Sequence, residues 1–211
     1  MNYPEDFINK VIQGDCLEIM KGMPNKCVDL VVTDPPYGME FQSNYRFQKH
    51  DKIVGDDRFP VEVISELTRL ARKAVYIFCR WDNLAELPPP KSVLAWVKNN
   101  WSMGDLLHEH GRQWEAIAFY PQTEHEFIKR IPDVIHTNRT GNNLHPTEKP
   151  VDLIKTIIMA NTGEIVFDPF LGSGTTAVAA KQLGRKYIGI EISDRYCQIA
   201  RDRLRQDVLP W

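Results

Sequence analysis

Short apolar runs recur along the chain and are separated by segments long enough to form helices. Seven of these runs are expected to be strands, and they start at residues 10, 28, 74, 92, 115, 164 and 186. The runs are nearly continuous in Val, Ile, Phe and Tyr, which is typical of strands buried on both faces of a parallel sheet. The pattern therefore predicts a mostly parallel, seven-stranded sheet.

Helical patterns fill several of the intervals between these runs. Residues 59–73 place their apolar side chains on one helical face, and Pro60 opens the segment. Further helices are predicted from Pro150 to Gly163, over residues 174–184, and after Ser193 as N-cap. The alternation of strands with helices predicts a doubly wound α/β fold.

Two long polar segments interrupt this alternation. Residues 39–59 and 121–149 are polar, mixed in charge and without a clear period. Loops of this length inside a compact domain are usually functional or disordered. A chain of 211 residues suits a single domain, so we expect one domain over residues 1–211 with these loops as insertions.

Composition narrows the class of protein only slightly. The chain is 43% hydrophobic and carries a net charge of −2, which gives no global signal for nucleic acid. No apolar run approaches the roughly 20 residues of a membrane span. Four scattered cysteines without a CxxC pair argue against disulfides and a zinc site. We therefore expect a cytoplasmic protein without a bound metal.

The first chemical motif is "TDPPYG", residues 33–38, directly after a predicted strand. Asp34 supplies a carboxylate, while Pro35 and Pro36 fix the backbone and cannot donate a hydrogen bond. Tyr37 adds an aromatic ring. The motif predicts a rigid polar clamp at the end of a strand. In the alternative, Asp34 only caps a turn and Tyr37 is a rim aromatic that packs on its neighbours.

The second motif is "FDPFLGSGTT", residues 167–176, in which a strand ends at Asp168 and a helix opens near Thr175. Glycines let backbone N–H groups approach a ligand, so the turn is typical of nucleotide-type cofactors. It lacks the G-x-G-x-x-G of dinucleotide oxidoreductases and the Gly-Lys-Ser/Thr of a P-loop. Glu191 ends the next strand, where an acidic residue can bind ribose hydroxyls. The alternative is a tight turn with a surface glutamate.

These motifs carry a resemblance to a known family. "TDPPYG" at 33–38, "HPTEKP" at 145–150, "FDPFLGSGTT" at 167–176 and "YIGIEISDRYCQIARDRL" at 187–204 resemble S-adenosylmethionine-dependent amino-group DNA methyltransferases. The catalytic motif precedes the cofactor glycines, which is the permuted order of the family's β group. The protein-glutamine methyltransferases share an (N/D)PPY motif but have the unpermuted order. The resemblance implies a circularly permuted, Rossmann-like sheet with an antiparallel strand on its C-terminal side.

The resemblance also implies a cofactor, S-adenosylmethionine, and a set of residues that bind it. Asp15 could instead be an N-cap, and Asp168 could only brace the glycine turn. Thr147 and Lys149 could instead be solvated residues at a helix start. The implied cofactor-binding residues are Asp15, Cys16, Thr147, Lys149, Asp168, Pro169, Phe170, Gly172, Ser173, Gly174, Thr175, Thr176 and Glu191.

The catalytic residues implied are Asp34, Pro35, Pro36 and Tyr37. The exocyclic amine of a base is a poor nucleophile, because its lone pair is delocalised into the ring. The Asp34 carboxylate and the Pro35 carbonyl can accept its two N–H groups, and Tyr37 can stack on a flipped base. The methyl group then moves by direct in-line transfer. We expect N6 of adenine as the acceptor; N4 of cytosine stays open, as does a non-catalytic DNA-binding protein on the same fold.

Double-stranded DNA is the expected partner, with the two long loops, 39–59 and 121–144, as candidate recognition insertions. Their basic side chains suit contacts to phosphates and base edges, although ordinary solvated loop charges are the alternative. The resemblance also raises a homodimer and a restriction endonuclease as partners. The candidate DNA-binding residues are Arg46, Lys49, Lys52, Lys129, Arg130 and Arg139.

Overall fold

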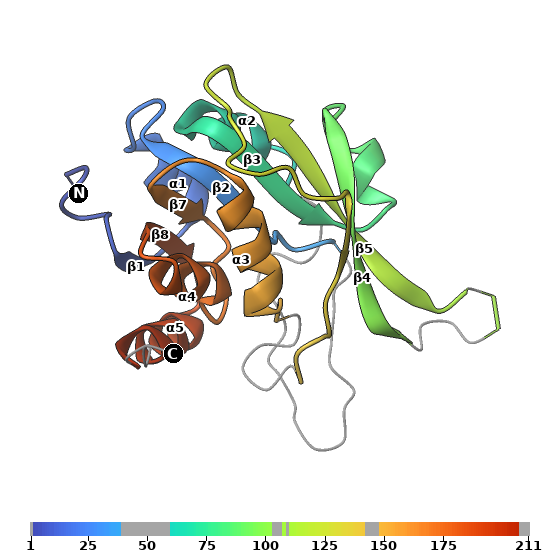
Figure 1. Ribbon diagram of the computed structural model, residues 1–211. Helices are drawn as coiled ribbons and strands as arrows, with labels where there is room; N and C mark the ends of the chain where they lie inside the picture. Colours follow the sequence, from blue (N-terminus) through green and yellow to red (C-terminus); the bar gives the residue numbers. More distant parts are fainter. Residues whose placement is uncertain (1, 39–59, 103–106, 109, 142–147, 207–211) are drawn as a thin grey trace.

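A mixed sheet forms the centre of the computed structural model, which describes residues 2–38, 60–102, 107–108, 110–141 and 148–206 (Figure 1). Within these residues the sheet has eight strands in the order β1-β8-β7-β2-β3-β5-β4-β6. The strands are β1 (Lys10–Gln13), β2 (Val28–Thr33), β3 (Ala71–Cys79), β4 (Ser92–Ser102), β5 (Arg112–Pro121), β6 (Val134–His136), β7 (Ile165–Asp168) and β8 (Lys186–Glu191). Only β5 runs antiparallel to its two neighbours, so the mostly parallel α/β sheet is confirmed.

Helices cover both faces of this sheet, as a doubly wound fold requires. Side chains of α1 and α2 enter one core cluster, whereas those of α3 and α4 enter a second cluster on the opposite face. α5 packs beside α4 and against β1. The helices are α1 (Cys16–Lys21), α2 (Val63–Leu70), α3 (Val151–Ala160), α4 (Thr175–Gln182) and α5 (Asp194–Arg205), with a short 3-10 helix η1 (Asn83–Ala85).

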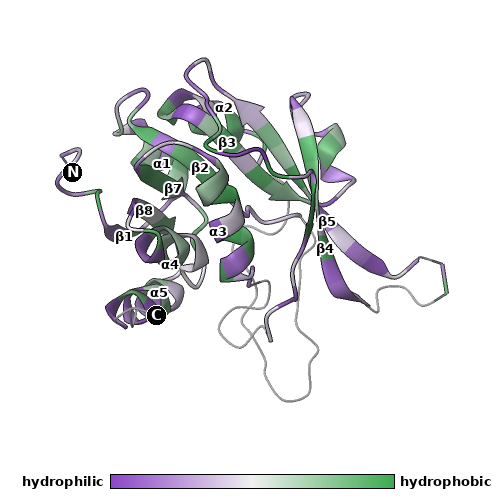
Figure 2. Ribbon diagram, in the orientation of Figure 1, coloured by the Kyte–Doolittle hydropathy of each residue, from purple (hydrophilic) through white to green (hydrophobic). Residues whose placement is uncertain are grey.

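Strand β2 shows why the apolar runs are continuous rather than alternating. Val31 belongs to the cluster under α1 and α2, while Leu30 and Val32 belong to the cluster under α3 and α4. Every residue of β2 is buried. Successive side chains of a strand point to opposite faces, so a strand covered on both sides needs apolar residues at both. Figure 2 shows the resulting hydrophobic central strands between amphipathic helices.

Two details of the expected sheet were wrong. The sheet has an eighth strand, β6, inside the segment 121–144 that we expected to be a loop; it is only three residues long and pairs with β4 (Trp96 with Ile135). The pattern could not reveal it, because only Ile135 of its residues is buried. The antiparallel strand is β5, in the middle of the chain and not on its C-terminal side.

The permuted strand order brings distant parts of the chain together. The last strand, β8, pairs in parallel with the first, β1, and Arg201 of α5 donates a hydrogen bond of 3.0 Å to the carbonyl of Val11. The carboxyl ends of β2, β7 and β8 consequently lie along one edge of the sheet. Among the described residues, no helix is long and apolar enough to cross a membrane.

Candidate active site

Two strand-end aspartates bring the two sequence motifs together. β2 and β7 are neighbours in parallel register, so Asp34 and Asp168 follow them at the same edge. The hydroxyl of Thr33 donates a hydrogen bond of 2.7 Å to Asp168 Oδ1. The "TDPPYG" segment and the glycine turn are therefore in direct contact, although Thr33 and Asp168 are 135 residues apart.

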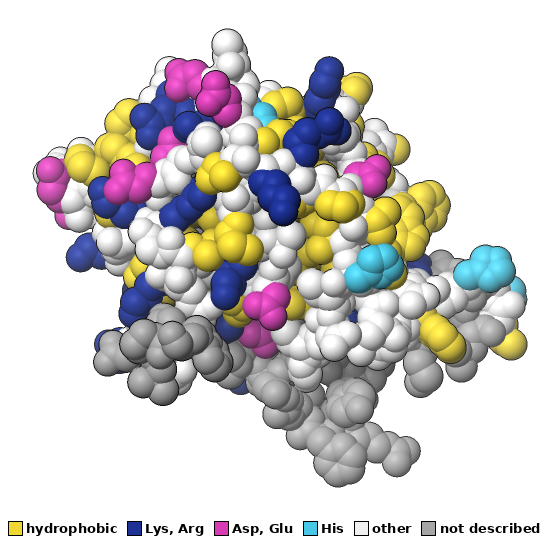
Figure 3. Space-filling view, viewed as in Figure 1, with side chains coloured by type: hydrophobic (Ala, Val, Ile, Leu, Met, Phe, Trp, Pro, Cys, Tyr) yellow, Lys and Arg dark blue, Asp and Glu magenta, His cyan; other side chains and the backbone are white. Residues whose placement is uncertain are grey.

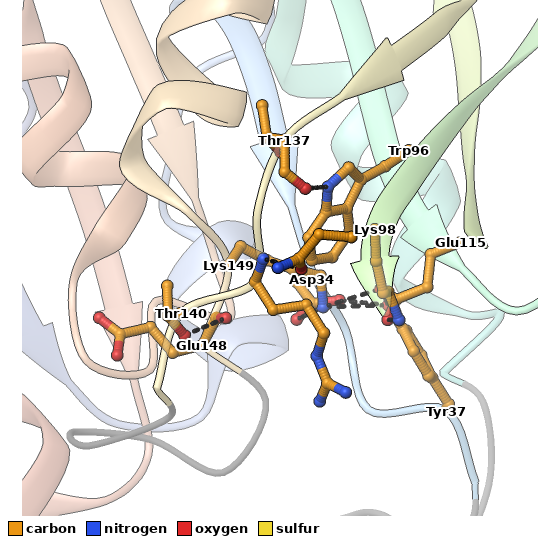
Figure 4. A network of polar contacts seen from close by, with 11 residues as sticks. Asp34, Tyr37, Trp96, Lys98, Glu115, Thr137, Thr140, Glu148 and Lys149 are labelled. Atoms are coloured by element: carbon orange, nitrogen blue, oxygen red, sulfur yellow. Dashed lines mark hydrogen bonds and ion pairs between the residues drawn. The ribbon is translucent and has the colours of Figure 1, made fainter. Parts of the chain in front are cut away.

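Both oxygens of the Asp34 carboxylate accept hydrogen bonds from side chains of the protein (Figure 4). Lys149 Nζ lies 2.6 Å from Oδ2, and the Tyr37 hydroxyl lies 2.5 Å from Oδ1. Lys149 Nζ also lies 3.3 Å from the Tyr37 oxygen and 5.4 Å from the centre of its ring. Lys149, expected at the cofactor, is thus grouped by the structure with the catalytic motif.

Two further charged side chains complete this cluster, Glu115 on β5 and Lys98 on β4. Glu115 Oε2 lies 3.3 Å from Lys149 Nζ, and Glu115 Oε1 accepts a hydrogen bond from Lys98. Burial opposes ionisation of Glu115, but Lys149 and Lys98 lower its pKa to about 2. Burial alone would lower the pKa of Lys149, yet Asp34 and Glu115 raise it. The cluster therefore holds two ammonium groups and two carboxylates, of which the ammonium groups are buried and the carboxylates largely buried.

Sequence reasoning missed Glu115 and Lys98. Each is a charged residue at the end of an otherwise apolar run, "SVLAWVK" or "EAIAFY", where the side chain becomes largely buried. Charged side chains are almost never buried without a partner. A lysine at the end of one apolar run and a glutamate at the start of the next could therefore have predicted a buried ion pair.

Electrostatics within the cluster keep Tyr37 neutral and make Asp34 a stronger base than usual. Burial, followed by the charges of Asp34 and Glu115, raises the pKa of Tyr37 well above its ordinary value, so its hydroxyl stays a donor. Burial also raises the pKa of Asp34, and Glu115 adds to this effect while Lys149 opposes it. A carboxylate with a raised pKa accepts hydrogen bonds more strongly.

The glycine turn between β7 and α4 is held by carboxylates that accept backbone N–H groups. Gly172 N donates to Glu191 Oε2 at 2.8 Å, and Ser193 N donates to Oε1 at 2.9 Å. Phe170 N donates to Asp168 Oδ1 at 3.1 Å, so Asp168 does brace the turn. Burial raises the pKa of Asp168 to about 6, although the hydrogen bonds it accepts oppose this shift.

The hydroxyl side chains of the turn are used within the protein. Arg203 of α5 donates to the Ser173 carbonyl at 2.8 Å and lies 3.3 Å from Thr175 Oγ1. The Thr176 hydroxyl lies 3.5 Å from a carbonyl of β2. Arg203 also pairs with Glu148 at 3.1 Å, next to Lys149 in the sequence. A ligand at this turn would therefore meet backbone groups. Arg203, which lies in the motif at 187–204 but was not among the candidate site residues, links the turn to Glu148, the residue before Lys149.

The remaining cofactor candidates are Asp15 and Cys16 at the start of α1, Pro169 and Phe170 after β7, and Thr147. Asp15 Oδ1 accepts a hydrogen bond of 3.1 Å from Glu18 N, so it is the N-cap of α1, as the alternative held. Cys16 is half-buried, and burial followed by the charge of Asp15 raises the pKa of its thiol to about 12. Pro169 is buried, while Phe170 packs on the cluster beneath α1 and α2. Thr147 lies outside the described residues.

The DNA-binding candidates fall into separate groups. The backbone N–H of Arg139 donates to Asn99 Oδ1 at 3.3 Å, and Asn99 directly follows Lys98 on β4. Arg139 therefore lies at the same edge of the sheet as the charged cluster, which is called the catalytic edge below. Lys129 N bonds to the Ala160 carbonyl at the C-terminal end of α3, so Lys129 and Arg130 lie at the opposite edge of the sheet (Figure 1). Arg46, Lys49 and Lys52 lie outside the described residues.

Two other kinds of site would be a basic patch on the face drawn in Figure 3 and a metal-binding cluster among the described residues. In the face drawn in Figure 3, lysine and arginine side chains are interspersed with acidic ones and do not form a single basic patch. Within the described ranges, no group of His, Cys, Asp and Glu could hold a metal ion.

A doubly wound sheet with an acidic clamp beside a glycine turn is the arrangement that the resemblance to methyltransferases implies. The model of a DNA methylase family, with N6 and N4 members, matches residues 96–202. The putative methylase YubD of Escherichia coli is 33% identical over 93% of this chain and 90% of its own length. This chain therefore belongs to the N6/N4 DNA methylase family.

Other similar proteins include both enzymes and solved structures. The type II methyltransferase M.HinfI of Haemophilus influenzae is 25% identical over 95% of this chain and 69% of its own length. The structure of the M1.HpyAVI–SAM complex is 26% identical, covers 92% of this chain and 98% of its own, and superimposes with a TM-score of 0.69. The N4-cytosine-specific PvuII methyltransferase, at 15% identity and a TM-score of 0.69, shares the fold.

Proposed function

We propose that this DNA methyltransferase transfers the methyl group of S-adenosylmethionine to N6 of an adenine flipped out of double-stranded DNA. The observation that carries the proposal is the position of Asp34. It lies at the end of β2, largely buried, with the glycine turn of β7 in contact with the preceding residue. An amine held by Asp34 would face a ligand held by that turn.

The residues at the turn are chemically suited to S-adenosylmethionine, which supplies a methyl group activated on a sulfonium. Gly172 and Gly174 have φ values of 55° and 92°, which glycine adopts readily because it has no side chain. The backbone of the turn is therefore uncovered at these two positions. The Glu191 carboxylate accepts the backbone N–H groups of Gly172, Ser193 and Ile192, which leaves it acceptor capacity that a ribose hydroxyl can use. The turn from Asp168 to Thr176, with Glu191, Asp15 and Cys16, would hold the molecule.

The catalytic motif would position and activate the amine. Asp34 and the Pro35 carbonyl accept its two N–H groups, which favours a tetrahedral nitrogen as positive charge develops there. Pro36 keeps the segment rigid, so little ordering is needed when the base binds. Tyr37, neutral at working pH, hydrogen-bonds Asp34 and presents its ring beside the base. Transfer is direct and in-line, without a covalent enzyme intermediate.

Adenine is supported by relatives and by the order of the motifs. The DNA adenine methyltransferase YhdJ of Escherichia coli is 29% identical over 92% of this chain and 82% of its own length. The permuted order matches the β group. N4 of cytosine is the second candidate, because its amine poses the same chemical problem and the PvuII enzyme shares the fold.

DNA contacts would come from the catalytic edge. Arg139 beside Asn99 belongs to this edge, and Arg46, Lys49 and Lys52 in the insertion 39–59 are its further candidates. Lys129 and Arg130 lie at the opposite edge and are not part of this surface. A homodimer, a restriction endonuclease partner and a cytoplasmic location stay predictions; the four free cysteines agree with a reducing compartment.

Nucleoside analysis of treated DNA tests the proposal. DNA is incubated with the protein and S-adenosylmethionine, digested to nucleosides and analysed by mass spectrometry. We expect N6-methyladenine, and a rate lower by roughly 10²–10³-fold in Asp34→Asn, which removes one charged acceptor. Asp202→Asn, at an exposed ion pair on α5, is the matched control and should leave the rate unchanged. N4-methylcytosine without N6-methyladenine would falsify the choice of base.

A further inference from the structure

The amino group of Lys149 is bound to the Asp34 carboxylate, which is the group that a target amine would also bind. Lys149 Nζ lies 2.6 Å from Asp34 Oδ2, while Tyr37 uses Oδ1. The side chain of Lys149 is only 7% exposed, so an ammonium group displaced from Asp34 cannot simply move into water. A buried cation that loses its partner is costly unless another anion receives it.

We propose that Glu115 is a positioning residue that receives the Lys149 ammonium when the amine of the target base binds Asp34. The proposal rests on the function of Asp34 proposed above. It assigns to Glu115 a step in base binding that precedes methyl transfer. The exchange is a movement of one ammonium group between two carboxylates, and no covalent bond changes.

The geometry of Glu115 suits this exchange. Its Oε2 lies 3.3 Å from Lys149 Nζ, so a rotation of the lysine side chain away from Asp34 brings the ammonium group into an ordinary charged hydrogen bond with Glu115. Its Oε1 is bound by Lys98, which also lies 5.0 Å from the centre of the Trp96 ring. Glu115 is thus held by Lys98 through Oε1. Its Oε2 faces Lys149 Nζ and also the Tyr37 hydroxyl, which lies 3.4 Å away (Figure 4).

The exchange also removes a conflict of charge. Positive charge develops on the amine nitrogen during methyl transfer, and an ammonium group on the same carboxylate would repel it. Turning Lys149 toward Glu115 lengthens its contact with Asp34, so more of the Asp34 charge stabilises the new charge on the amine. The ionised state of Glu115 is secure over any working pH, because the two lysines lower its pKa to about 2 against the effect of burial.

The alternative is that Glu115 is only structural and ties β5 to the segment before α3. The two readings differ in kinetics. Glu115→Gln keeps the size of the side chain but no longer draws Lys149 away from Asp34. We expect kcat to fall about 10–100-fold while the Kd for S-adenosylmethionine stays unchanged, because the glycine turn is untouched.

The pH profile reports whether the charge of Glu115 acts on Asp34, which the exchange requires, and a double variant then tests the exchange itself. The charge of Glu115 raises the pKa of Asp34, so its removal lowers that pKa. The acid limb of kcat/KM, where Asp34 becomes protonated, should therefore move to lower pH in Glu115→Gln. Glu115→Asp should restore the acid limb and part of kcat. Glu164→Gln, at an exposed pair with Lys186, is the matched control.

A double variant distinguishes a loss of activity caused by misfolding of Glu115→Gln from one caused by the missing acceptor for Lys149. Glu115→Gln leaves two buried cations with one anion, whereas Glu115→Gln with Lys149→Met leaves one of each, Lys98 and Asp34. Because no ammonium then competes for Asp34, the double variant should be about 10-fold faster than Glu115→Gln alone. Equal or lower activity of the double variant, or an unmoved acid limb in Glu115→Gln, would overturn the proposal. A wild-type protein that methylates no amine would instead overturn the proposed function.

Discussion

Two neighbouring strands end in the same Asp-Pro pair, yet their aspartates are held by different chemistry. Asp34 after β2 is bound by Lys149 and Tyr37, and Lys149 is shared with Glu115. Asp168 at the end of β7 accepts hydrogen bonds from a hydroxyl and from the backbone N–H of Phe170. The catalytic half is therefore a cluster of charged side chains, and the cofactor half is a backbone turn braced by carboxylates.

The difference matches what each half has to do. In the mechanism proposed here, the Asp34 carboxylate changes partners when a base arrives, and the ammonium group that it shares with Glu115 moves. A cofactor turn must keep one shape, and backbone N–H groups bound to Glu191 and Asp168 fix that shape. The charged cluster around Asp34 should therefore respond to substitutions that change charge. The glycine turn should respond to substitutions that change backbone shape or its carboxylate acceptors.

The largest expected contrast is the pH dependence of stability at Asp168. Burial raises its pKa from 3.8 to about 6, so the folded state binds this proton more tightly than the unfolded state. The stabilisation is complete below pH 3.8 and is lost as pH rises through 6, a total of about 3 kcal/mol at roughly 1.4 kcal/mol per pKa unit. Asp168→Asn has no such titration. Its free energy of unfolding should rise relative to wild type by about 3 kcal/mol over this window.

Urea denaturation of the cofactor-free protein between about pH 4 and 7.5 measures this slope. Asp202→Asn, at an exposed pair on α5, should run parallel to wild type. A constant difference between Asp168→Asn and wild type across the window would mean that the Asp168 carboxylate is as well solvated as in the unfolded chain.

The cofactor half was largely readable from the sequence because it is local. Phe170 contacts Asp168 two residues away, and Gly172 contacts Glu191 nineteen residues away. One strand–turn–helix–strand unit contains all of these positions. Its pattern of apolar runs, glycines and a strand-end acid therefore predicted both the fold and the position of Glu191.

The catalytic half was only partly readable because its partners come from distant strands. Lys149 is 115 residues from Asp34, and Glu115 is 78 residues from Tyr37. Which strand lies beside β3 decides whether Glu115 reaches the site, and β5 is inserted there between β3 and β4. The motif identified Asp34, but only the sheet order could bring Glu115 and Lys98 to it.

A smaller effect is expected at Glu191, and it should appear in binding alone. Glu191→Gln replaces one accepting oxygen with an NH₂ group, so one backbone N–H of the turn loses its acceptor. A lost charged hydrogen bond costs about 1.5–3 kcal/mol, which predicts a roughly 10–100-fold weaker Kd for S-adenosylmethionine. At saturating S-adenosylmethionine, kcat should stay within about threefold of wild type.

Isothermal titration calorimetry and steady-state kinetics separate the two quantities. Glu164→Gln, exposed at the start of β7, controls for loss of a negative charge near this unit. If Glu191→Gln lowered kcat as strongly as Glu115→Gln does, the two halves would not be functionally distinct.

The smallest effect compares two glycines at the two ends of α4. Gly174 and Gly184 have φ values of 92° and 68°, so alanine at either costs about 1 kcal/mol of backbone strain. A Cβ at Gly174 would also lie 2.9 Å from the Cβ of Ala200 on α5, whereas one at Gly184 would meet nothing within 4 Å. Gly174→Ala should therefore lower the free energy of unfolding by about 1–3 kcal/mol more than Gly184→Ala, as measured by urea denaturation. Equal losses would mean that α5 yields to the added methyl group, and the shape of the turn would then depend on its carboxylates more than on its packing.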